Sequence, residues 1–454
     1  MIVRTIDAII RMLDADYIEN GNIEEKISGV CIDSRRVEEG NLYIPIRGAN
    51  NNGHVFVKQA IEKGAKAVLW ERQEPNPPQD VVVILVEDTT KALQDLAKAY
   101  RHQLQMKVVA ISGSNGKTST KDILGSLLKT HYMTQKTMGN YNNEIGVPLT
   151  LLSFDENIEA AVVEMGMENL GELSFLTHLV EPDVAILTNV GTAHLENLGS
   201  MENIAKAKVE IVESLKPGSL FIYNGDDAYL KQAVIDKVIP GYVRIKTFGE
   251  TSKHDCVVRD IKQKKEGLSF HLNDVMYHLD MIGSHNAYNA AGAYLAAVEL
   301  GLSQSEIVQG FQAIEKTGLR NELVSFGKCC ILNDAYKSNP QSALAAMDTM
   351  ESFDYDYRIA VLADMLELGE TSDMIHYQLG KDLAKYHVDE VLTYGDMARY
   401  IAQGAYSEGL QVQHFTKKED MITYLKPYAE KECMILIKGS RGMKLEEIVE
   451  GLVK

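Results

Sequence analysis

The chain has 454 residues, and its 46 Lys and Arg against 64 Asp and Glu give a formal net charge of -18. That length predicts about three domains, and the charge has the wrong sign for a protein that gathers nucleic acid by its phosphates. Five cysteines without a CxxC pair argue against a disulfide framework and against a zinc knuckle. The composition therefore favours a protein of the reducing cytoplasm that acts on small molecules.

The first segment, residues 1–105, is predicted to be an α/β unit. Residues 1–20 carry apolar positions at helical spacing and should open the chain with a helix, but acidic residues interrupt them. No cleavage site follows, so a signal peptide is not expected. No apolar run reaches the ~20 residues of a membrane span, so no membrane association is expected either.

The second segment, 106–316, alternates apolar strands with helices, which is typical of a parallel sheet covered on both faces. Its later part, residues 256–283, is instead predicted to form antiparallel hairpins. The third segment, 317–454, alternates again, with strands expected near residues 329–336, 358–365, 389–396 and 433–440. The expected fold class is α/β with three domains, at 1–105, 106–316 and 317–454.

The stretch "MKVVAISGSNGKTSTKDILGSLL", residues 106–128, resembles a phosphate-binding loop, although Ile111 stands where the usual pattern has its first glycine. The triplet Gly116-Lys117-Thr118 falls between a β-branched strand and a helix, where backbone N–H groups and the helix dipole favour an anion. Lys117 can reach the outer phosphates of a nucleotide, and the Thr118 hydroxyl can bind Mg²⁺. The alternative is an ordinary glycine-containing turn.

Two polar residues follow the next strands of the same segment. A magnesium nucleotide needs a nearby carboxylate, and Glu164 ends the apolar strand 160–164. His194 lies in the loop beyond the following strand, at the carboxyl edge where open sheets bind ligands. Each residue also has an ordinary explanation, Glu164 as a solvated acid and His194 as a loop histidine. Their shared position favours a ligand site.

Lys208 interrupts the apolar stripe of the expected helix 201–215, whereas Lys206 lies on its polar face. A lysine on a buried stripe either extends outward to water, or meets an anion, or loses its proton through desolvation. A neutral amine in a metal site can react with carbon dioxide to form a carbamate, which would change this cation into an anion. The spacing alone leaves all of these readings open.

Side chains that could contact a nucleoside occur in two further places. Asn286 and Asn289 lie at the start of an Ala-rich helix, where their amides could bind a base edge, although helix capping explains Asn286 equally well. Asp334 follows a strand and could accept a hydrogen bond from a ribose hydroxyl, while the nearby "SNP" could be only a turn. The segment "KGSRGMK" could bind an anion or simply connect two elements.

Six long motifs occur in one order: "GSNGKTST", "GNYNNEIGVPLT", "EMGM", "TNVGTAHLENLGSMENIAKAK", "GSHNAYNA" and "NDAYKSNP". With them the chain resembles, over its whole length, the Mur ligase family, ATP-dependent enzymes that form amide bonds in bacterial cell-wall synthesis. Three segments, "GNYNNEIGVP", "EMGM" and "KGSRGMKLEEIV", most resemble the members that join D-alanyl-D-alanine to UDP-N-acetylmuramoyl-tripeptide through an acyl phosphate. The resemblance implies a central ATPase domain between a UDP-substrate domain and a Rossmann-like domain for the dipeptide.

The resemblance also implies roles for single residues. Lys117 would contact the terminal phosphate of ATP, and Thr118 and Glu164 would hold a first magnesium ion. His194 would hold a second magnesium ion, with Lys208, as a carbamate formed from carbon dioxide, orienting it. Further nucleotide contacts would come from Gly113, Ser114, Asn115, Gly116, Ser119, Asn286, Asn289, Arg320 and Asp334. The UDP-linked substrate would be bound by Asp33, Ser34, Arg35, Arg47, Gly48, Asn142 and Asn143.

Two residues depart from the family pattern, because Asn52 and Lys337 stand where relatives commonly have aspartate and asparagine. The resemblance implies two substrate partners, the UDP-linked tripeptide and D-alanyl-D-alanine, and a monomeric chain is expected. Four alternative functions remain: a sister ligase that adds a single amino acid, a folylpolyglutamate synthase-like ligase, a kinase that stops after phosphoryl transfer, and a regulatory module that binds a nucleotide without turnover.

Overall fold

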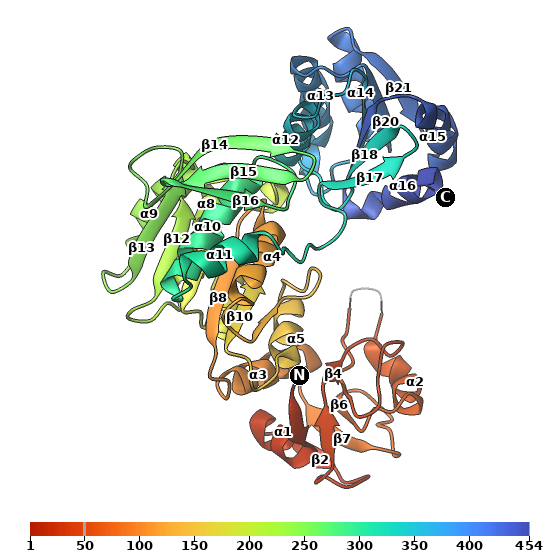
Figure 1. The fold of residues 1–454 in the computed structure, drawn as a ribbon. Helices are drawn as coiled ribbons and strands as arrows, with labels where there is room; N and C mark the ends of the chain where they lie inside the picture. Colours follow the sequence, from red (N-terminus) through yellow and green to blue (C-terminus); the bar gives the residue numbers. More distant parts are fainter. Residues whose placement is uncertain (49–50, 454) are drawn as a thin grey trace.

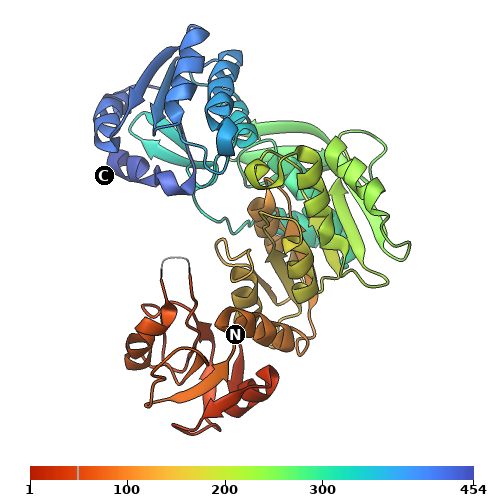
Figure 2. The same ribbon diagram turned by 180° about the vertical axis from the view of Figure 1, so that it is seen from behind.

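The computed structural model describes residues 1–48 and 51–453, which fold into three α/β groups in sequence order. Figure 1 shows the first group, in red and orange, and the third, in blue, at opposite ends of the central group. The view from behind in Figure 2 shows the same order. The expected α/β class with a central parallel sheet is confirmed.

The first group contains the strands β1 (Val3–Thr5), β2 (Asp16–Ile18), β3 (Lys26–Ser28), β4 (Val30–Cys31), β5 (Leu42–Tyr43), β6 (Ala67–Glu71) and β7 (Val82–Val86), and the helices α1 (Ile6–Leu13), α2 (Val57–Glu62) and α3 (Thr89–Arg101). Its main sheet has the order β2-β7-β6-β5-β4, and β2 runs antiparallel to β7. The chain opens with β1, paired with β3, and not directly with the expected helix. That helix begins at Ile6, where the Thr5 hydroxyl accepts a hydrogen bond from the Ala8 N–H.

The central group contains the strands β8 (Lys107–Ser112), β9 (Thr134–Lys136), β10 (Ala160–Glu164), β11 (Val184–Leu187), β12 (Leu220–Asn224), β13 (Arg244–Gly249), β14 (Cys256–Lys264), β15 (Gly267–Leu272) and β16 (Val275–Leu279). They form one sheet in the order β16-β15-β14-β13-β12-β11-β8-β10-β9. The pairs from β9 to β14 are parallel, and β14, β15 and β16 pair antiparallel, as predicted.

Helices cover both faces of the central sheet: α4 (Lys117–Leu128), α5 (Gly146–Ser153), α6 (Glu172–Val180), α7 (Leu195–Leu198), α8 (Met201–Val209), α9 (Ala228–Lys237), α10 (Asn286–Glu299) and α11 (Gln304–Phe311). Successive strand residues point to opposite faces, so Val108 and Val109 enter different hydrophobic cores. The Val108 core also contains Ile6 and Tyr100 of the first group. The first and central groups therefore share one core.

The third group contains the strands β17 (Glu322–Phe326), β18 (Cys329–Asp334), β19 (Arg358–Ala363), β20 (Glu390–Tyr394), β21 (Gln411–Phe415) and β22 (Met434–Lys438), and the helices α12 (Pro340–Glu351), α13 (Ser372–Asp382), α14 (Ala398–Ser407), α15 (Lys418–Leu425) and α16 (Glu446–Val453). The four strands expected here are present, as β18, β19, β20 and β22. The sheet has the order β17-β18-β22-β19-β20-β21, with β17 antiparallel to β18. Its two cores are built from residues of this group, apart from Ile282, which packs at their edge.

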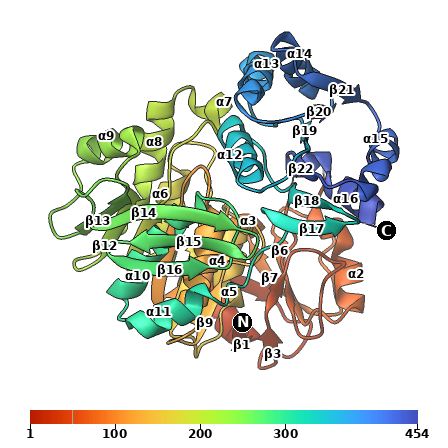
Figure 3. The same ribbon diagram turned by 45° about the horizontal axis from the view of Figure 1, so that its top comes forward.

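The strand order sets where a ligand can bind. Because β8 lies between β10 and β11, the loops that follow these three parallel strands leave the same edge of the sheet. Glu164 pairs in register with Ile111, and Leu187 pairs with Ser112. Figure 3 shows α7 and α12 at the place where the central and third groups face one another. Within the described ranges, no helix has the length and apolar character needed to cross a bilayer.

Candidate active site

The phosphate-binding loop runs from the end of β8 to the start of α4, as the sequence predicts. Ile111 is a fully buried residue of β8, so the strand continues through the position of the usual first glycine and the loop is shorter. Gly116 has a φ of 82°, and a Cβ there would lie 2.3 Å from the Asn289 Oδ1. Gly113 has a φ of 149°, and a Cβ there would lie 1.9 Å from the Thr188 Oγ1. Both glycines are therefore required by backbone conformation and by close packing.

A second set of contacts fixes the loop against the end of β11. The backbone N–H groups of Ser114 and Asn115 donate to the backbone and side-chain oxygens of Asn189, at 2.9 and 3.0 Å. The Ser114 hydroxyl accepts a hydrogen bond from the Gly191 N–H at 2.8 Å. The loop is held rigidly on one side, which suits a binding site that must keep its shape.

Lys117 folds back over its own loop. Its Nζ donates to the Gly113 carbonyl at 2.6 Å and to the Ser114 carbonyl at 3.3 Å. Burial, followed by the positive charge of Lys337, lowers the pKa of Lys117 to about 8. The charges of Glu164 and Glu367 favour the ammonium in part, and a phosphate placed within this loop would add an opposite charge in direct contact with it.

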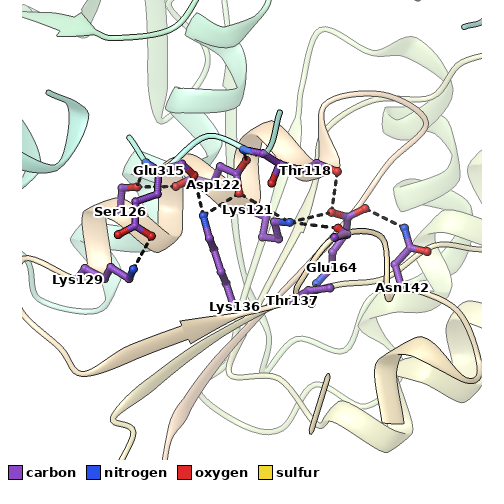
Figure 4. A network of polar contacts seen from close by, with 12 residues as sticks. Thr118, Lys121, Asp122, Ser126, Lys129, Lys136, Thr137, Asn142, Glu164 and Glu315 are labelled. Carbon is purple, nitrogen blue, oxygen red and sulfur yellow. Dashed lines mark hydrogen bonds and ion pairs between the residues drawn. The ribbon is translucent and has the colours of Figure 1, made fainter. Parts of the chain in front are cut away.

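Glu164 ends β10 directly opposite the loop, and its carboxylate is only 2% exposed. The Thr118 hydroxyl donates to Oε2 at 2.8 Å, and the Asn142 amide donates to Oε1 at 2.8 Å. Figure 4 shows these groups converging at the start of α4. The two side chains predicted to share a magnesium ion are thus already in contact. Asn142, predicted to contact substrate, lines the cavity and also holds this carboxylate.

A buried ionic network continues from Glu164 along α4 (Figure 4). The Lys121 Nζ lies 3.9 Å from Glu164 Oε2 and 3.7 Å from Asp122 Oδ1. Asp122 accepts hydrogen bonds from the Lys136 ammonium at 2.8 Å and from the Thr317 N–H at 2.7 Å. Thr317 begins the linker to the third group, so the network connects the carboxylate of the site with that linker.

His194 and Lys208 lie on the other side of the loop. His194 adopts a left-handed backbone with a φ of 65°, and its Nδ1 lies 3.5 Å from the Glu367 carboxylate of the third group. Burial, followed by the charges of Lys337, Lys117 and Lys208, lowers the pKa of His194 to about 3, which leaves the imidazole neutral. A neutral imidazole nitrogen is the form that can bind a metal.

Lys208 is only 1% exposed, so its side chain does not extend outward to water, which was one of the possibilities left open by the sequence. No hydrogen bond or ion pair connects its ammonium to another residue in the part of the chain that is described. Burial, followed by the charges of Lys117 and Lys337, lowers the pKa of Lys208 well below its usual value. Lys206, two residues earlier, is exposed as predicted.

The third group contributes side chains to the same site. The Asn339 amide, at the N-cap of α12, donates to the Asn115 side-chain oxygen of the loop at 2.9 Å. The Arg320 guanidinium lies 4.0 Å from the centre of the Tyr336 ring. The Asp334 carboxylate accepts a hydrogen bond from the buried Lys438 ammonium at 2.6 Å. The Asn339 contact brings the third group against the phosphate loop, and Arg320, Tyr336 and Asp334 line the same cavity.

One cavity of about 1260 Å³ lies between the central and third groups, with Ile32 of the first group at its edge. The predicted site residues that line it are Ser114, Asn115, Gly116, Lys117, Thr118, Ser119, Asn142, Asn143, Glu164, His194, Asn289, Arg320 and Asp334. Gly113, Lys208 and Asn286 lie outside its lining, beneath the loop and helices. Asn286 is buried, with its amide donating to the Ile282 carbonyl and its oxygen accepting from the Asn289 amide.

The first-group residues predicted to bind the UDP-linked substrate lie away from this lining, to which the first group contributes only Ile32 among the described residues. Arg35 and Asp33 form an ion pair at 2.8 Å, and the Arg35 side chain is 79% exposed. The Arg47 guanidinium is held by Glu71 at 2.9 Å and by Glu74 at 2.7 Å. The Ser34 hydroxyl donates a hydrogen bond to the Gln59 side chain, and the Gly48 N–H donates to the Asn51 carbonyl. The Asn52 amide donates to Glu74, and its oxygen accepts from the His54 N–H.

Several residues of the site could not be singled out from the sequence. Lys121 follows Lys117 by one helical turn, and its burial on α4 could have been read from that spacing. Tyr336, Asn339 and Glu367 reach the site only through the docking of the third group, which has no local signal. Among the described residues no three His, Cys, Asp or Glu side chains cluster as a metal site.

Three family models match the chain: the Mur ligase family catalytic domain over residues 26–101, the Mur ligase middle domain over 111–297, and the Mur ligase glutamate ligase domain over 319–441. The UDP-N-acetylmuramoyl-tripeptide–D-alanyl-D-alanine ligase of Bacillus subtilis is 41% identical, over 100% of this chain and 99% of that protein. The Escherichia coli ligase of the same name is 32% identical, over 94% of each chain.

Solved structures agree with these sequence matches. A crystal structure of MurF from Acinetobacter baumannii superposes with a TM-score of 0.91 at 28% identity, over 100% of this chain and 99% of that one. The MurF ligase of Thermotoga maritima in complex with ADP superposes with a TM-score of 0.81 at 27% identity, over 93% of this chain and 96% of that one. The similarity therefore extends through all three groups.

Proposed function

This chain belongs to the Mur ligase family, and we propose that it uses ATP to join D-alanyl-D-alanine to the C-terminal carboxylate of UDP-N-acetylmuramoyl-tripeptide. The product is the UDP-linked pentapeptide used in peptidoglycan synthesis. The relatives of that name match almost the whole chain. One structural observation carries the proposal: a single cavity is lined by the phosphate loop, Glu164 and residues of the third group, as a ligase of three substrates requires.

The reaction we propose begins with phosphoryl transfer. The tripeptide carboxylate attacks the terminal phosphorus of ATP, the bond to the bridging oxygen breaks, and ADP leaves with the electron pair. The backbone N–H groups of Gly116 to Ser119 and the Lys117 ammonium would hold the phosphates during this step, because the Ser114 and Asn115 N–H groups already donate to Asn189. The amine of D-alanyl-D-alanine then attacks the acyl carbon, phosphate leaves, and the amine loses a proton. Residues of the second and third groups line the cavity, so their closure would exclude water from the acyl phosphate.

The residues present fit a magnesium ion bound together with ATP. Mg²⁺ prefers oxygen ligands and usually takes one or two from the protein, with the rest from phosphates and water. Thr118 and Glu164, 2.8 Å apart, would hold the first ion, and the neutral imidazole of His194 would contact a second. Bound there, the ions would neutralise charge on the phosphates.

We also propose that Lys208 carries a carbamate formed with carbon dioxide, which would orient the second ion. Carbamate formation needs an uncharged amine, and burial lowers the pKa of Lys208 well below its usual value. The resulting anion would lie near Lys117 and Lys337, the two cations that disfavour a charged Lys208. The absence of any hydrogen bond or ion pair to the amine within the described residues supports this assignment.

The remaining roles are proposals of the same kind. Nucleoside contacts would come from Asn286, Asn289, Arg320 and Asp334, with Asn286 acting through its hydrogen bond to Asn289. The segment 1–105 would bind the UDP end of the substrate, 106–316 would bind ATP, and 317–454 would bind the dipeptide. We propose that the enzyme is cytoplasmic, because the cytoplasm supplies both ATP and the UDP-linked substrate. We also propose that it is monomeric.

One experiment tests this function against its alternatives. ADP release is measured with UDP-N-acetylmuramoyl-tripeptide while the amine is varied. We expect release that depends on D-alanyl-D-alanine and gives the pentapeptide. A preference for a single amino acid would indicate a sister ligase, and a requirement for a folate would indicate the folylpolyglutamate reaction. Release that needs no amine would indicate a kinase, and binding without any release would indicate a regulatory module.

A further inference from the structure

Lys337 brings a positive charge from the third group to the phosphate loop. It lies between β18 and α12 and lines the same cavity as Lys117 and His194. Its side chain is 45% exposed, so it extends into the cavity and not into a core. Its contact with the Glu367 carboxylate is long, with 3.4 Å between Nζ and Oε2. The ammonium is thus available to a further anion.

The backbone around Lys337 is held on both sides. Its carbonyl accepts a hydrogen bond from the Lys438 ammonium at 2.9 Å, and that ammonium also pairs with Asp334 at 2.6 Å. Two residues further on, Asn339 is hydrogen-bonded to Asn115 of the phosphate loop at 2.9 Å. Lys337 therefore starts from a fixed point beside the loop, and only its side chain has freedom to move.

The positive charge of Lys337 lowers the pKa of three other side chains of the site. After burial, it is the largest influence that lowers the pKa of Lys117, to about 8, and the pKa of His194, to about 3. It also disfavours a charged Lys208. Like charges brought this close repel one another unless an anion lies between them. Glu367, Glu168 and Glu164 are carboxylates of this part of the cavity, and Glu164 is already engaged by Thr118 and Asn142.

We propose that Lys337 is a catalytic residue whose ammonium contacts the terminal phosphate of ATP and stays on that group while it moves to the substrate carboxylate. The proposal rests on the ligase function given above. In the step, one P–O bond forms to the carboxylate, the P–O bond to ADP breaks, and Lys337 keeps its proton throughout. A cation brought in from a second domain disperses the charge on the transferring group, as cations do in other phosphoryl-transfer enzymes.

Lys337→Met tests the charge, Lys337→Arg retains it, and Lys381→Met is the matched control. Lys381 is 41% exposed on α13 and pairs with Glu408 at 3.1 Å, so it has similar surroundings outside the cavity lining. Acyl phosphate is trapped as a hydroxamate in a single turnover without dipeptide. We expect Lys337→Met to slow its formation on the order of 10²-fold, Lys337→Arg to lose less than about 10-fold, and Lys381→Met to match the parent.

A binding measurement separates this proposal from the function on which it rests. The affinities for ATP and for ADP are compared by calorimetry, with no acceptor substrate present. Lys337→Met should weaken ATP more than ADP, because only ATP has the terminal phosphate. An unchanged ATP-to-ADP affinity ratio together with a parental rate of trapping would overturn the role of Lys337. Failure of the parent protein to form pentapeptide, with the affinity ratio shifted as expected, would overturn the ligase function alone.

Discussion

The two sides of the phosphate loop handle buried charge in opposite ways. On the α4 side, shown in Figure 4, the buried residues Lys121, Asp122 and Glu164 lie next to groups of opposite charge or hydrogen-bond donors. On the α8 side, Lys208 is as deeply buried but has no such partner among the described residues. Lys117, the first residue of α4, donates hydrogen bonds only to loop carbonyls, and its charge acts on Lys208.

This difference shows on which side of the loop the buried charges are already paired before any substrate binds. A buried charge without a partner is costly, and proteins keep one mainly where function requires it. The α4 network is satisfied by the protein itself and also holds the start of the linker at Thr317. The α8 side gathers cations whose missing counter-charges would be phosphates and a carbamate. The α4 side therefore supports the structure of the site, and the α8 side is where anions would bind.

The largest expected effect comes from removing the unpaired lysine. Lys208→Ala should reduce pentapeptide formation ~10³-fold or more, because the group proposed to orient the second metal ion is lost. Added small carboxylates such as acetate should restore part of the rate by filling the vacated space. Lys206→Ala, on the exposed face of the same helix, is the control and should match the parent. Full activity of Lys208→Ala would refute the carbamate.

Replacing Lys208 should not destabilise the protein, although it should abolish most of the activity. Lys208→Met keeps much of the side-chain volume and removes a buried polar amine without a hydrogen-bond partner among the described residues, so the free energy of unfolding of the ligand-free protein should not fall. A gain of about 1 kcal/mol is expected, measured by urea denaturation followed by circular dichroism. A loss of activity without a loss of stability would mark Lys208 as a functional and not a structural residue.

The next largest effect should come from breaking the paired side. Asp122→Ala removes the acceptor for Lys136 and for the Thr317 N–H, and leaves Lys121 without one of its two neighbouring carboxylates. Breaking a buried pair in this way costs about 3 kcal/mol or more. The cost is measured as the shift in the urea unfolding midpoint.

An exposed ion pair provides the control for Asp122. Lys91 and Asp95 form an i,i+4 pair on α3, with their side chains 62% and 49% exposed. Asp95→Ala should cost only about 0.5 kcal/mol or less, because water screens such a pair. If Asp122→Ala costs no more than Asp95→Ala, the α4 network is not the support described above.

Sequence reasoning reached the parts of this site that depend on local order. The strand, the glycine loop and the helix are contiguous, and Glu164 and His194 follow neighbouring strands, so their common edge could be predicted from alternation alone. The burial of Lys208 could be predicted from helical spacing. The family resemblance supplied the metal, carbamate and substrate roles, which no spacing could give.

The rest depended on contacts between distant segments. The strand β1 pairs with β3 more than 20 residues later, so local periodicity predicted a helix at the very start of the chain. Asn339 and Asn115 meet across 224 residues, and Lys337 reaches the loop only because the third group docks there. Arg47, predicted to bind substrate, also pairs with Glu71, a partner 24 residues away that no motif could reveal. Docking and pairing of this kind are set by tertiary packing.

The last expected effect is a dependence of stability on pH at the anion-receiving side. The pKa of Lys117 is about 8 in the folded protein against a usual 10.5, because burial and the charge of Lys337 disfavour the ammonium. The unfolded chain therefore binds more protons between these values, and the contribution of Lys117 to stability rises with pH from about 8 to 10.5, by at most about 1.4 kcal/mol per pH unit. Below that window the folded protein carries the full cost of the charge.

Lys117→Met isolates this contribution. The difference in unfolding free energy between Lys117→Met and the parent should favour the variant near neutral pH and shrink as the pH rises through the window, as measured by urea denaturation. Saturating ATP should reverse the order, because phosphate stabilises the ammonium and only the parent gains from it. Lys129→Met, which removes an exposed partner of Glu315, should show neither trend. A difference that stays constant with pH would mean that the Lys117 ammonium is already compensated, and that the two sides of the loop do not differ as described.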